Sequence, residues 1–560
     1  MASTSLIRAI SQLLLVFFVL LILLTNAHTL TPSPLRPAPT PPTAEAEATG
    51  ISPGLVSTMR ETLDVIRNVA SIISSFPIGG ILGGGDLRLS SAVADCLDLL
   101  DLSSDELSWS MSTTSSSASH PSSAGAGGRL GTGDARSDLR SWLSGALGNQ
   151  DTCKEGLDET GSVLGSLIAT GLEAVTSLLT DGLGQIAAGD AATFSASSRV
   201  SLSDRRGLAE AGTPRWLRTR ERRLLQMPVG PGGLPVDAVV AKDGSGNFTT
   251  VNAAVEAAPA ESAARYVIYV KKGVYKETVD VKKKKWNLML VGDGMGVTVI
   301  SGHRNYADGY TTYRSATISV NGKGFIARDL TFENTAGPAK HQAVALRCDS
   351  DLSVFYRCAF EGYQDTLYAH SLRQFYSDCR VTGTVDFVFG NAAAVFQNCT
   401  LLARLPLPDQ KNSVTAQGRL DANMTTGFAF QFCKVSAHDD LLRAQQGGAG
   451  NQTAAAPTQT YLGRPWKQYS RVVFMQSYIG AVVRPEGWLA WDGEFALDTL
   501  YYGEYMNTGP GAGIRARVKW PGFHVMTSPA EASNFTVAQF IEGNMWLPPT
   551  GVKYTVGLTS

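Results

Sequence analysis

Histidine is scarce in this chain, with seven among 560 residues, and the seven form no HxxxH or HExxH pattern. Those patterns let one helix present two imidazoles to a zinc ion, so no zinc site is predicted. The chain also has no P-loop and no GxGxxG sequence that would indicate a nucleotide site. GDGMG at 292–296 lacks the spacing and indicates a turn. We therefore expect neither a metal nor any other cofactor.

Charge is also sparse, because charged residues make up 17% of the chain and the net charge is −1. Up to Leu225, 17 Lys and Arg face 22 Asp and Glu; the remainder has 31 against 27. The mildly basic second part fits an acidic partner, and nothing beyond that basicity indicates nucleic-acid binding. A hydrophobic content of 44% over 560 residues predicts a globular protein with a sizeable core and more than one domain.

The N-terminus carries an apolar run, Leu13–Leu24, that is short for a membrane span. Arg8 precedes it and small residues follow, which predicts a signal peptide over 1–27, with an uncleaved signal anchor as the alternative. Secretion also fits five N-x-[ST] sequons. They lie at Asn247, Asn398, Asn423, Asn451 and Asn534.

Residues 28–50 are rich in Pro, Thr and Ala and are predicted to be a disordered linker. Residues 51–200 are predicted to form an all-helical domain, interrupted by a Ser/Gly-rich loop over 110–133. Its helical stripes are Leu55, Met59, Leu63, Ile66, Val69 and Ile73, and then Val163, Leu167, Leu172, Val175, Leu179, Leu183 and Ile186. Cys96 and Cys153 are the only cysteines here, and we expect them to join two helices.

Residues 201–225 form a basic linker that ends in Arg222, Arg223, Leu224 and Leu225. This sequence is typical of an exposed processing site, and Arg205–Leu208 is a weaker version. A merely solvated linker is the alternative.

From 226 to 560 the chain consists of short β-rich runs separated by Gly, Asn and Asp. An aromatic residue stands shortly before Cys358, Cys379, Cys399 and Cys433, at cysteine spacings of 21, 20 and 34. A period of 20–25 residues is too short for a strand–helix–strand unit and predicts coils of a right-handed parallel β-helix. Cysteines in phase predict disulfides Cys358–Cys379 and Cys399–Cys433, with Cys379–Cys399 equally compatible, and leave Cys348 free.

The same period gathers polar side chains. Gln342, Gln364 and Asp386 are separated by 22 residues each, and Asp365 adjoins Gln364. Stacked coils would bring two amides and two carboxylates to one groove, each rung about 5 Å from the next. A carboxylate can attack an ester carbonyl when amide donors await the oxyanion. The second carboxylate would hold its proton and act as general acid, then base.

Two alternatives remain for these four residues: a structural polar ladder, or a retaining glycosidase, which also uses carboxylates about 5 Å apart. The paired glutamines favour an ester, because an oxocarbenium-like sugar needs no oxyanion donors. Around the four, Arg464 would hold a carboxylate, and aromatic side chains offer faces to a sugar. Those aromatics are Trp466, Tyr368, Phe389 and Trp488, for each of which a core position is the alternative.

Five segments in order resemble the plant pectin methylesterases: GVYKE at 273–277, QAVAL at 342–346, QDTLY at 364–368, DFVFG at 386–390 and LGRPW at 462–466. The helical region, with ADCLDLL at 94–100 and SGALGNQDTC at 144–153, is similar to the pectin methylesterase inhibitor domain that precedes the catalytic domain in larger members. Three features depart from the family: no further N-terminal cysteine pair, the Ser/Gly-rich insertion, and a long segment over 440–457.

The resemblance implies a secreted, cell-wall pectinesterase that hydrolyses methyl esters of homogalacturonan and releases methanol. By motif, Asp386 is the nucleophile, Asp365 the acid and base, and Gln342 and Gln364 the oxyanion donors. Arg464 then holds Asp386, and Trp466, Tyr368, Phe389 and Trp488 contact the sugar. Expected partners are methyl-esterified homogalacturonan, a pectin methylesterase inhibitor protein and a subtilisin-like protease that cuts after RRLL; the catalytic domain is expected to be monomeric.

Two other hypotheses were weighed. A pectin lyase would need calcium-binding carboxylates with an arginine base, and a polygalacturonase a denser aspartate cluster; neither is visible. A non-catalytic protein whose helical domain inhibits other esterases would not need an intact set of catalytic positions.

Overall fold

The computed structural model describes residues 53–76, 86–116, 131–197, 233–447 and 458–559. Within them, four helices precede a stack of parallel strands: α3 (Pro53–Ser75), α4 (Leu87–Ser116), α5 (Ala135–Asp158) and α6 (Val163–Ser197). The signal segment, the processing sequence at 222–225 and the domain boundary at 226 lie outside the described residues.

The helices pack through the stripes that the sequence predicts, α4 on α5 and α3 on α6. All six predicted positions of α3 are buried, and so are the α6 positions from Leu172 onward. The prediction is wrong at the start of α6, where Val163 is exposed, and Leu164 and Ile168 face the core. The stretch Val163–Ala188 is apolar and long enough to cross a membrane by composition, but here it supplies one wall of this core.

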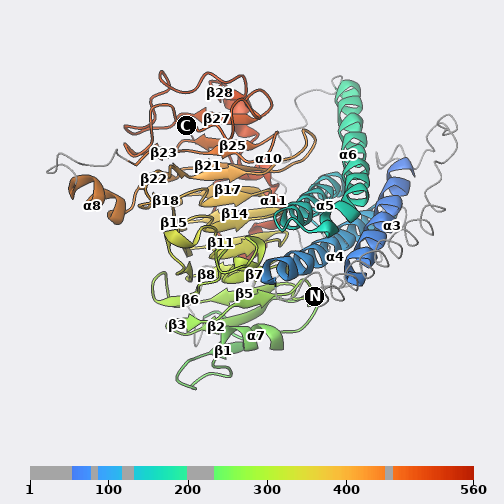
Figure 1. Ribbon diagram of the computed structural model, residues 1–560, viewed down its shortest axis with the longest axis horizontal. Coiled ribbons are helices and arrows are strands. Elements are labelled where there is room, and N and C mark those ends of the chain that lie inside the picture. The colour runs from blue at the N-terminus through green and yellow to red at the C-terminus, as the bar shows by residue number, and fades with distance from the viewer. Residues whose placement is uncertain (1–52, 77–85, 117–130, 198–232, 448–457, 560) are drawn as a thin grey trace, which may run out of the picture. The chain divides into compact units, whose positions relative to one another are not determined.

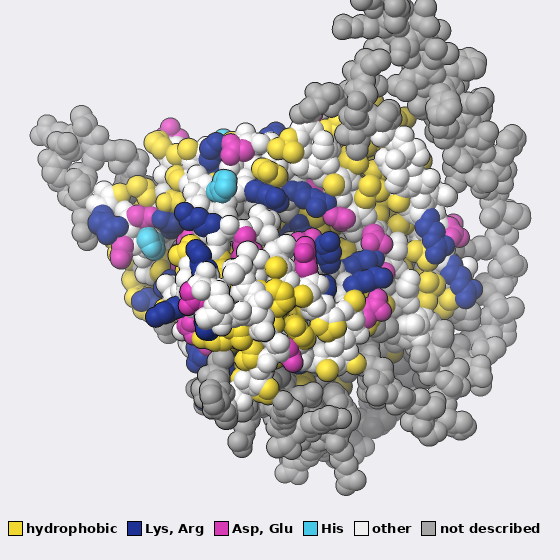
Figure 2. Space-filling view, turned by 90° about the horizontal axis from the view of Figure 1, so that it is seen from below, with side chains coloured by type: hydrophobic (Ala, Val, Ile, Leu, Met, Phe, Trp, Pro, Cys, Tyr) yellow, Lys and Arg dark blue, Asp and Glu magenta, His cyan; other side chains and the backbone are white. Residues whose placement is uncertain are grey.

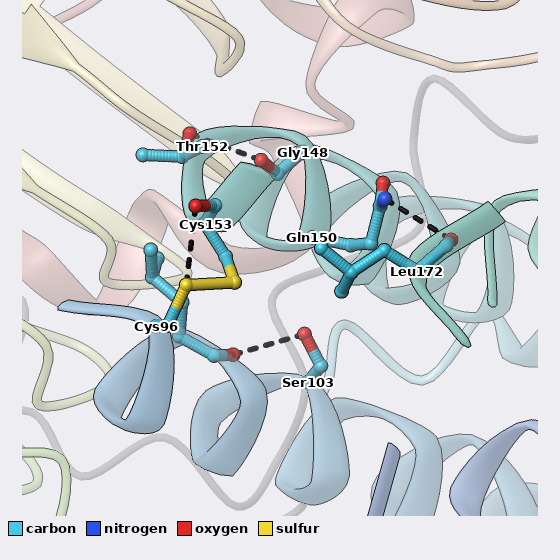
Figure 3. The surroundings of a disulfide bond; sticks show 8 residues. Cys96, Ser103, Gly148, Gln150, Thr152, Cys153 and Leu172 are labelled. Atoms are coloured by element: carbon cyan, nitrogen blue, oxygen red, sulfur yellow. Dashed lines mark hydrogen bonds between the residues drawn. A yellow bond between two sulfur atoms is a disulfide. The ribbon is translucent and has the colours of Figure 1, made fainter. Parts of the chain in front are cut away.

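Helix α5 begins where Asp134 accepts hydrogen bonds from the backbone N–H groups of Arg136 and Ser137, which satisfies donors that the first turn leaves open. Near its other end, Cys153 forms a disulfide with Cys96 of α4, as the sequence predicts. Figure 3 shows this bond between the two helices, with Thr152 beside it. The disulfide therefore fixes where the last two turns of α5 lie on α4.

The second part of the described chain is a parallel β-helix, which confirms the predicted fold class. Figure 1 shows consecutive strands of its largest sheet one above another. That sheet contains β1 (Ala238–Val240), β2 (Tyr266–Val270), β5 (Leu288–Val291), β8 (Ile326–Arg328), β11 (Ser353–Tyr356), β14 (Arg373–Ser377), β17 (Ala393–Gln397), β21 (Gly427–Gln431), β25 (Arg471–Met475), β27 (Tyr501–Tyr505) and β28 (Phe523–Val525).

Two further sheets and a few short elements complete the stack. The seven-stranded sheet runs β4 (Val279–Val281), β7 (Ile318–Val320), β10 (Leu346–Cys348), β13 (Leu367–Ala369), β16 (Val388–Gly390), β20 (Thr415–Gln417) and β24 (Arg464–Pro465). The eight-stranded sheet runs β3 (Gly273–Lys276), β6 (Thr298–Gly302), β9 (Thr331–Asn334), β12 (Ala359–Glu361), β15 (Arg380–Gly383), β18 (Thr400–Ala403), β22 (Lys434–Ala437) and β26 (Tyr478–Ile479). Outside them are the pair β19 (Asn412–Ser413) and β23 (Thr460–Tyr461), and the helices α7 (Val251–Ala257), α8 (Asp439–Gly447), α9 (Pro529–Ser533), α10 (Val537–Phe540) and α11 (Gly543–Trp546).

The aromatic-before-cysteine repeat is a ladder inside the β-helix. Phe355, Tyr376, Phe396, Phe430 and Phe474 are in register on neighbouring strands and stack with centroids 4.4–4.8 Å apart. This spacing is that of hydrogen-bonded strands. The ladder therefore fixes the register from β11 to β25.

The predicted disulfides of the β-helix are wrong: Cys358, Cys379, Cys399 and Cys433 are all buried free thiols, and Cys348 is free as expected. Each of the four directly precedes a strand of the eight-stranded sheet, at in-register positions. Parallel side chains on strands about 4.8 Å apart keep their Cβ atoms at a similar distance, whereas a disulfide prefers about 3.8 Å. The spacing that puts the cysteines in register thus also keeps their Cβ atoms farther apart than a disulfide prefers.

The Ser/Gly-rich stretch predicted as a loop from 110 is helical up to Ser116. Hydroxyls in this turn donate back to carbonyls of the preceding turn, as Ser110 does to Glu106 and Thr113 to Trp109. The ring of Trp109 packs edge-on against Trp142 of α5, with centroids 5.9 Å apart. The helix is thus extended by packing and local bonds, without a hydrophobic period.

Candidate active site

Asp365 and Asp386 occupy equivalent positions on adjacent coils. Each lies two residues before a strand of the seven-stranded sheet, and the pairing of Leu367 with Val388 puts the two aspartates in register. Both have left-handed backbone, with φ of 62° and 53°. Such conformations are costly outside glycine and cluster at functional sites. The 21-residue interval is therefore one coil, and the fold brings the two carboxyl groups together.

Arg464, on β24, holds Asp386 through two parallel hydrogen bonds. Its Nε donates to Oδ1 at 2.8 Å and its Nη2 to Oδ2 at 2.6 Å. This two-point contact fixes the carboxylate plane and stabilises its charge. The predicted role of Arg464 as the residue that positions Asp386 is consistent with this geometry.

Asp365 has no such partner among the described residues and is 7% exposed. Burial raises the pKa of Asp365 well above its ordinary value, and the neighbouring charge of Asp386 raises it further. Arg464 lowers the pKa of Asp365 only in part. Of the two carboxyl groups, Asp365 is therefore the one whose surroundings favour the protonated form, beside a carboxylate that an arginine holds.

Gln342 and Gln364 line the same cavity as the two aspartates, but not as the expected ladder. The coil period here is 21 residues, since Leu346 pairs with Leu367 and Leu367 with Val388. A spacing of 22 therefore shifts each glutamine by one position relative to the next coil. Oε1 of Gln364 is buried and accepts no hydrogen bond from a described residue.

Three of the predicted aromatic residues form one wall of the cavity. Tyr368 and Phe389 are in register and stack with centroids 4.1 Å apart. Trp466 lies tilted against both, at 6.4 Å from Tyr368 and 6.0 Å from Phe389. A flat, rigid face of this kind beside the carboxyl groups suits the apolar face of a sugar ring.

The prediction for Trp488 is wrong, because this side chain is 1% exposed within the core of the β-helix. It stacks on Tyr502 at 4.2 Å, and its Nε1 donates to Glu504 at 3.2 Å. Trp491 lines the cavity instead, with its ring 4.3 Å from the Arg464 guanidinium. Both tryptophans belong to EGWLAWDG, a segment without a period that could tell one from the other.

The helical region closes the cavity from the other side, which the sequence did not predict. Asp95 of α4 and Thr152, Glu155, Gly156 and Glu159 in or just after α5 line it together with the carboxyl groups. Thr311, Thr312 and Tyr313, just before β7, complete the lining. The cavity volume is about 260 Å³. Part of the wall beside the two carboxyl groups therefore belongs to the helical region.

Among the described residues, no three His, Cys, Asp or Glu side chains gather in a way that would hold a metal ion.

Comparisons with known proteins show which families the two parts of the chain resemble. The pectinesterase family model matches residues 237–544, and the plant invertase/pectin methylesterase inhibitor model matches 33–183. The pectinesterase/pectinesterase inhibitor PPE8B of Prunus persica is 55% identical over 497 residues, covering 89% of this chain and 88% of that protein. The probable pectinesterase/pectinesterase inhibitor 44 of Arabidopsis thaliana is 51% identical over 518 residues, covering 90% and 93%. A solved pectin methylesterase from carrot is 54% identical with a TM-score of 0.56, covering 59% of this chain and all of that chain.

Proposed function

This chain belongs to the pectinesterase family, and from that membership we propose how its cavity hydrolyses the methyl esters of homogalacturonan. The enzyme is a carboxylic ester hydrolase that acts on pectin, with an inhibitor-like domain before the catalytic part. The observation that carries the mechanism is the asymmetry of the two aspartates: Arg464 holds Asp386, while Asp365 has a raised pKa.

In the first half-reaction, a carboxylate oxygen of Asp386 attacks the ester carbonyl carbon. The amide N–H groups of Gln342 and Gln364 stabilise the oxyanion that forms. Asp365 donates its proton to the departing methoxy oxygen, and methanol leaves. The galacturonate carbonyl is then joined to Asp386 as an acid anhydride, and Asp365 is left as a carboxylate.

In the second half-reaction, Asp365 takes a proton from water, and the resulting hydroxide attacks the carbonyl carbon of the anhydride. The bond to Asp386 breaks, a free galacturonate carboxyl group leaves, and Asp365 is protonated again. Trp466, Tyr368 and Phe389 hold the sugar during both steps. The cycle consumes one water and one ester and returns both aspartates to their starting states.

The helical region is proposed to keep the enzyme inactive until it is removed. Support comes from its position across the cavity, where Asp95, Thr152 and Glu155 stand beside the catalytic groups. Cleavage by a subtilisin-like protease after Arg222, Arg223, Leu224 and Leu225 would break the covalent connection between the two parts, and secretion would deliver the enzyme to cell-wall pectin. A separate inhibitor protein of the same helical family would use the same surface.

The test is methanol release from methylated pectin by the fragment 226–560. Carrot pectin methylesterase, whose solved chain corresponds to 59% of this one, indicates that a part of this size folds alone. Asp386→Asn should lower kcat by at least about a thousandfold, and Asp365→Asn by roughly 10²- to 10⁴-fold. Asp409→Asn is the matched control, because Asp409 is exposed, also has positive φ (66°) and does not line the cavity. Full activity in Asp386→Asn would refute the mechanism, and chain scission in place of methanol release would refute the function.

A further inference from the structure

Four of the five N-x-[ST] sequons lie in the part of the chain that the structure describes, and one of the four differs from the rest. Asn247, Asn398 and Asn534 are exposed, which suits a bulky surface modification. Asn423 is half-buried, and Met424, the middle residue of its sequon, is 1% exposed. The neighbours that cover this sequon belong to the helical region.

Helix α5 contacts the backbone on both sides of Met424. Nη2 of Arg140 donates to the carbonyl oxygen of Asn423 at 3.2 Å. The N–H of Thr425 donates to Oγ of Ser144 at 3.2 Å. Met424 itself packs in the same hydrophobic cluster as the core of the helical region. The hydroxyl of Thr425, which the sequon requires, is buried and has no hydrogen-bond partner among the described residues.

Helix α6 stands against the atom to which a glycan attaches. A Cβ atom placed on Gly184 of α6 would lie 4.0 Å from Nδ2 of Asn423, which is ordinary van der Waals contact. A sugar ring bonded to Nδ2 needs more room than this close packing offers, and the rings beyond it need more still. A glycan on Asn423 would therefore meet α6 at its first ring.

The loop between β20 and β21 that carries Asn423 is held on the β-helix by hydrogen bonds of its own. Asp421 accepts from the N–H of Asn423 at 2.7 Å. Arg419 and Arg471 each donate to the carbonyl oxygen of Met424 at 3.1 Å. These bonds do not involve the helical region, so they fix the sequon whether or not the helices are docked. Relief of a clash at Nδ2 would therefore come from movement of the helical region.

Close ion pairs join the helical region to the β-helix. Lys467 contacts Asp151 of α5 at 2.7 Å, and Arg373 contacts Asp138 of α5 at 2.7 Å. On the face shown in Figure 2, acidic and basic side chains are interspersed and form no broad patch of one sign. Close ion pairs weaken when their charges are moved apart and water enters between them. A glycan wedged against α6 would therefore also loosen the contacts of α5.

The order of synthesis exposes Asn423 before the helices can cover it. The chain is made from its N-terminus, so the helical region enters the secretory compartment ahead of Asn423. Its docking surface is completed later, because Lys467, which holds α5, follows Asn423 in the sequence. N-glycans are transferred to the extended chain as it emerges, so Asn423 meets the oligosaccharide donor before docking.

We propose that Asn423 is an N-glycosylation site and that a glycan there keeps the helical region from docking. Nδ2 of Asn423 loses a proton and forms a bond to C1 of the first N-acetylglucosamine. The bond from C1 to the lipid pyrophosphate of the donor breaks, and the pyrophosphate leaves with the electron pair. This inference rests on the proposed function and adds to it a form of the enzyme that is open before the linker is cut. Asn423, Met424 and Thr425 are not among the described residues that line the catalytic cavity, so the glycan leaves the catalytic groups accessible.

The experiment uses the full chain, secreted from eukaryotic cells, in a form in which only Asn423 can carry a glycan. The other four sequons are removed by Asn247→Gln, Asn398→Gln, Asn451→Gln and Asn534→Gln. A lectin column separates chains with the glycan from chains without it, and mass spectrometry of the Asn423 peptide confirms occupancy. Both populations are cut within 198–232, and the Kd between the two parts is measured by sedimentation, which requires no catalysis.

Chains with the glycan should bind their helical part at least about tenfold more weakly, because the clash penalises only that form. Enzymatic removal of the glycan should restore the tighter binding. Thr425→Ala removes the sequon and should yield only glycan-free chains with the tighter Kd. Thr425→Ser is the matched control, because it keeps the sequon and should yield both populations. Neither variant costs a hydrogen bond to a described residue, since the Thr425 hydroxyl has none.

Each other outcome bears on a different step. An Asn423 that carries no glycan in any secreted chain overturns the site, and an equal Kd in the two populations overturns the exclusion. Failure of both populations to bind the helical part overturns the docked arrangement and the inference with it. A cut enzyme that releases no methanol overturns only the esterase mechanism, since occupancy and Kd are measured without it.

Discussion

Trp488 and Trp491 are three residues apart and have different surroundings, which leads to opposite expectations for their removal. Trp488 is buried between Tyr502 and Phe474 with its N–H bonded to Glu504, whereas Trp491 is 36% exposed at the cavity. Trp488→Ala should lower the free energy of unfolding by about 3–5 kcal/mol, because it leaves a large void and removes one hydrogen bond to Glu504. Trp491→Ala should change that free energy by less than about 1 kcal/mol and raise KM for pectin.

Urea denaturation and methanol-release kinetics of the fragment 226–560 measure both effects. Trp488→Phe serves as the control that restores most of the volume without the indole N–H. Equal loss of stability in Trp488→Ala and Trp491→Ala would contradict the different placements.

The reactive residues themselves were predictable, because their spacing equals one coil. A 21-residue interval put Asp365 beside Asp386, and the motif resemblance assigned Arg464, which the structure finds bonded to Asp386. The left-handed backbone of both aspartates was not predictable, since no residue type in the sequence requires it. The choice between Trp488 and Trp491 also depends on three-dimensional packing, so the sequence assigned the wrong one.

The helices show what a hydrophobic period can and cannot predict at the scale of an element. The stripe of α3 was predicted at every position, whereas the start of α6 was shifted by one residue because Val163 lies in its first, exposed turn. The end of α4 at Ser116 carries no hydrophobic period, so the sequence predicts a loop there, whereas the structure is helical. The spacing of the β-helix cysteines correctly predicts that they are in register on neighbouring coils. The disulfides predicted from it are wrong, since in-register parallel positions disfavour a disulfide.

The disulfide between α4 and α5 is expected to stabilise the helical region. Cys96 and Cys153 are separated by 57 residues, and closing a loop of that length removes chain entropy worth about 4 kcal/mol from the unfolded state. The double variant Cys96→Ser and Cys153→Ser should therefore lower the free energy of unfolding of the helical region by up to about that amount. The β-helix should keep its own unfolding transition.

Urea unfolding of the full chain, followed separately for helical and strand signals, measures this loss. Cys348→Ser is the control, because Cys348 is a buried free thiol that closes no loop. Thiol titration of the unfolded, unreduced chain should find five reactive groups. Finding one would mean that the β-helix cysteines are bonded after all.

At the scale of the whole molecule, the helical region meets the β-helix through buried charged groups. The guanidinium of Arg373 on β14 contacts Asp138 of α5 at 2.7 Å and Asp351 of the β-helix at 2.7 Å. Trp142 of α5 donates its N–H to the same Asp351 at 3.1 Å. These contacts are non-covalent and do not involve the linker, so we expect the two parts to stay associated when the linker alone is cut. Release of the helical region then needs a second influence.

A rise in pH supplies one, because docking raises the pKa of carboxyl groups in the helical region. Burial raises the pKa of Asp95 to about 6, although Arg314, Thr311 and Arg347 act in the opposite direction. Burial and the nearby charge of Asp151 likewise raise the pKa of Glu155 to about 7. Lys467 contacts both Asp151 and Glu155, so its single charge is shared between them. It therefore offsets only part of the cost of burying these two carboxylates.

The sign of the pH dependence follows from the protons bound in each state. Between the ordinary carboxyl pKa values near 4 and the docked values of about 6 and 7, the docked state holds more protons than the separated state. Docking is therefore strongest at or below about pH 4 and weakens as the pH rises to about 7. Each pKa unit of difference changes the dissociation constant about tenfold over that range.

The measurement uses full chain cut within 198–232 by a protease, with the association of the two parts followed by sedimentation at pH 5 and pH 7.5. The dissociation constant should be at least about tenfold larger at pH 7.5, and methanol release should rise with it. Asp95→Asn with Glu155→Gln should bind with a less pH-dependent constant, because neither side chain then titrates. Asp64→Asn is the control, since Asp64 of α3 is exposed and pairs with Arg67 of its own helix. Tighter association at pH 7.5 than at pH 5 would show that ion-pair attraction outweighs burial at Asp95 and Glu155, and would reverse the proposed direction of control.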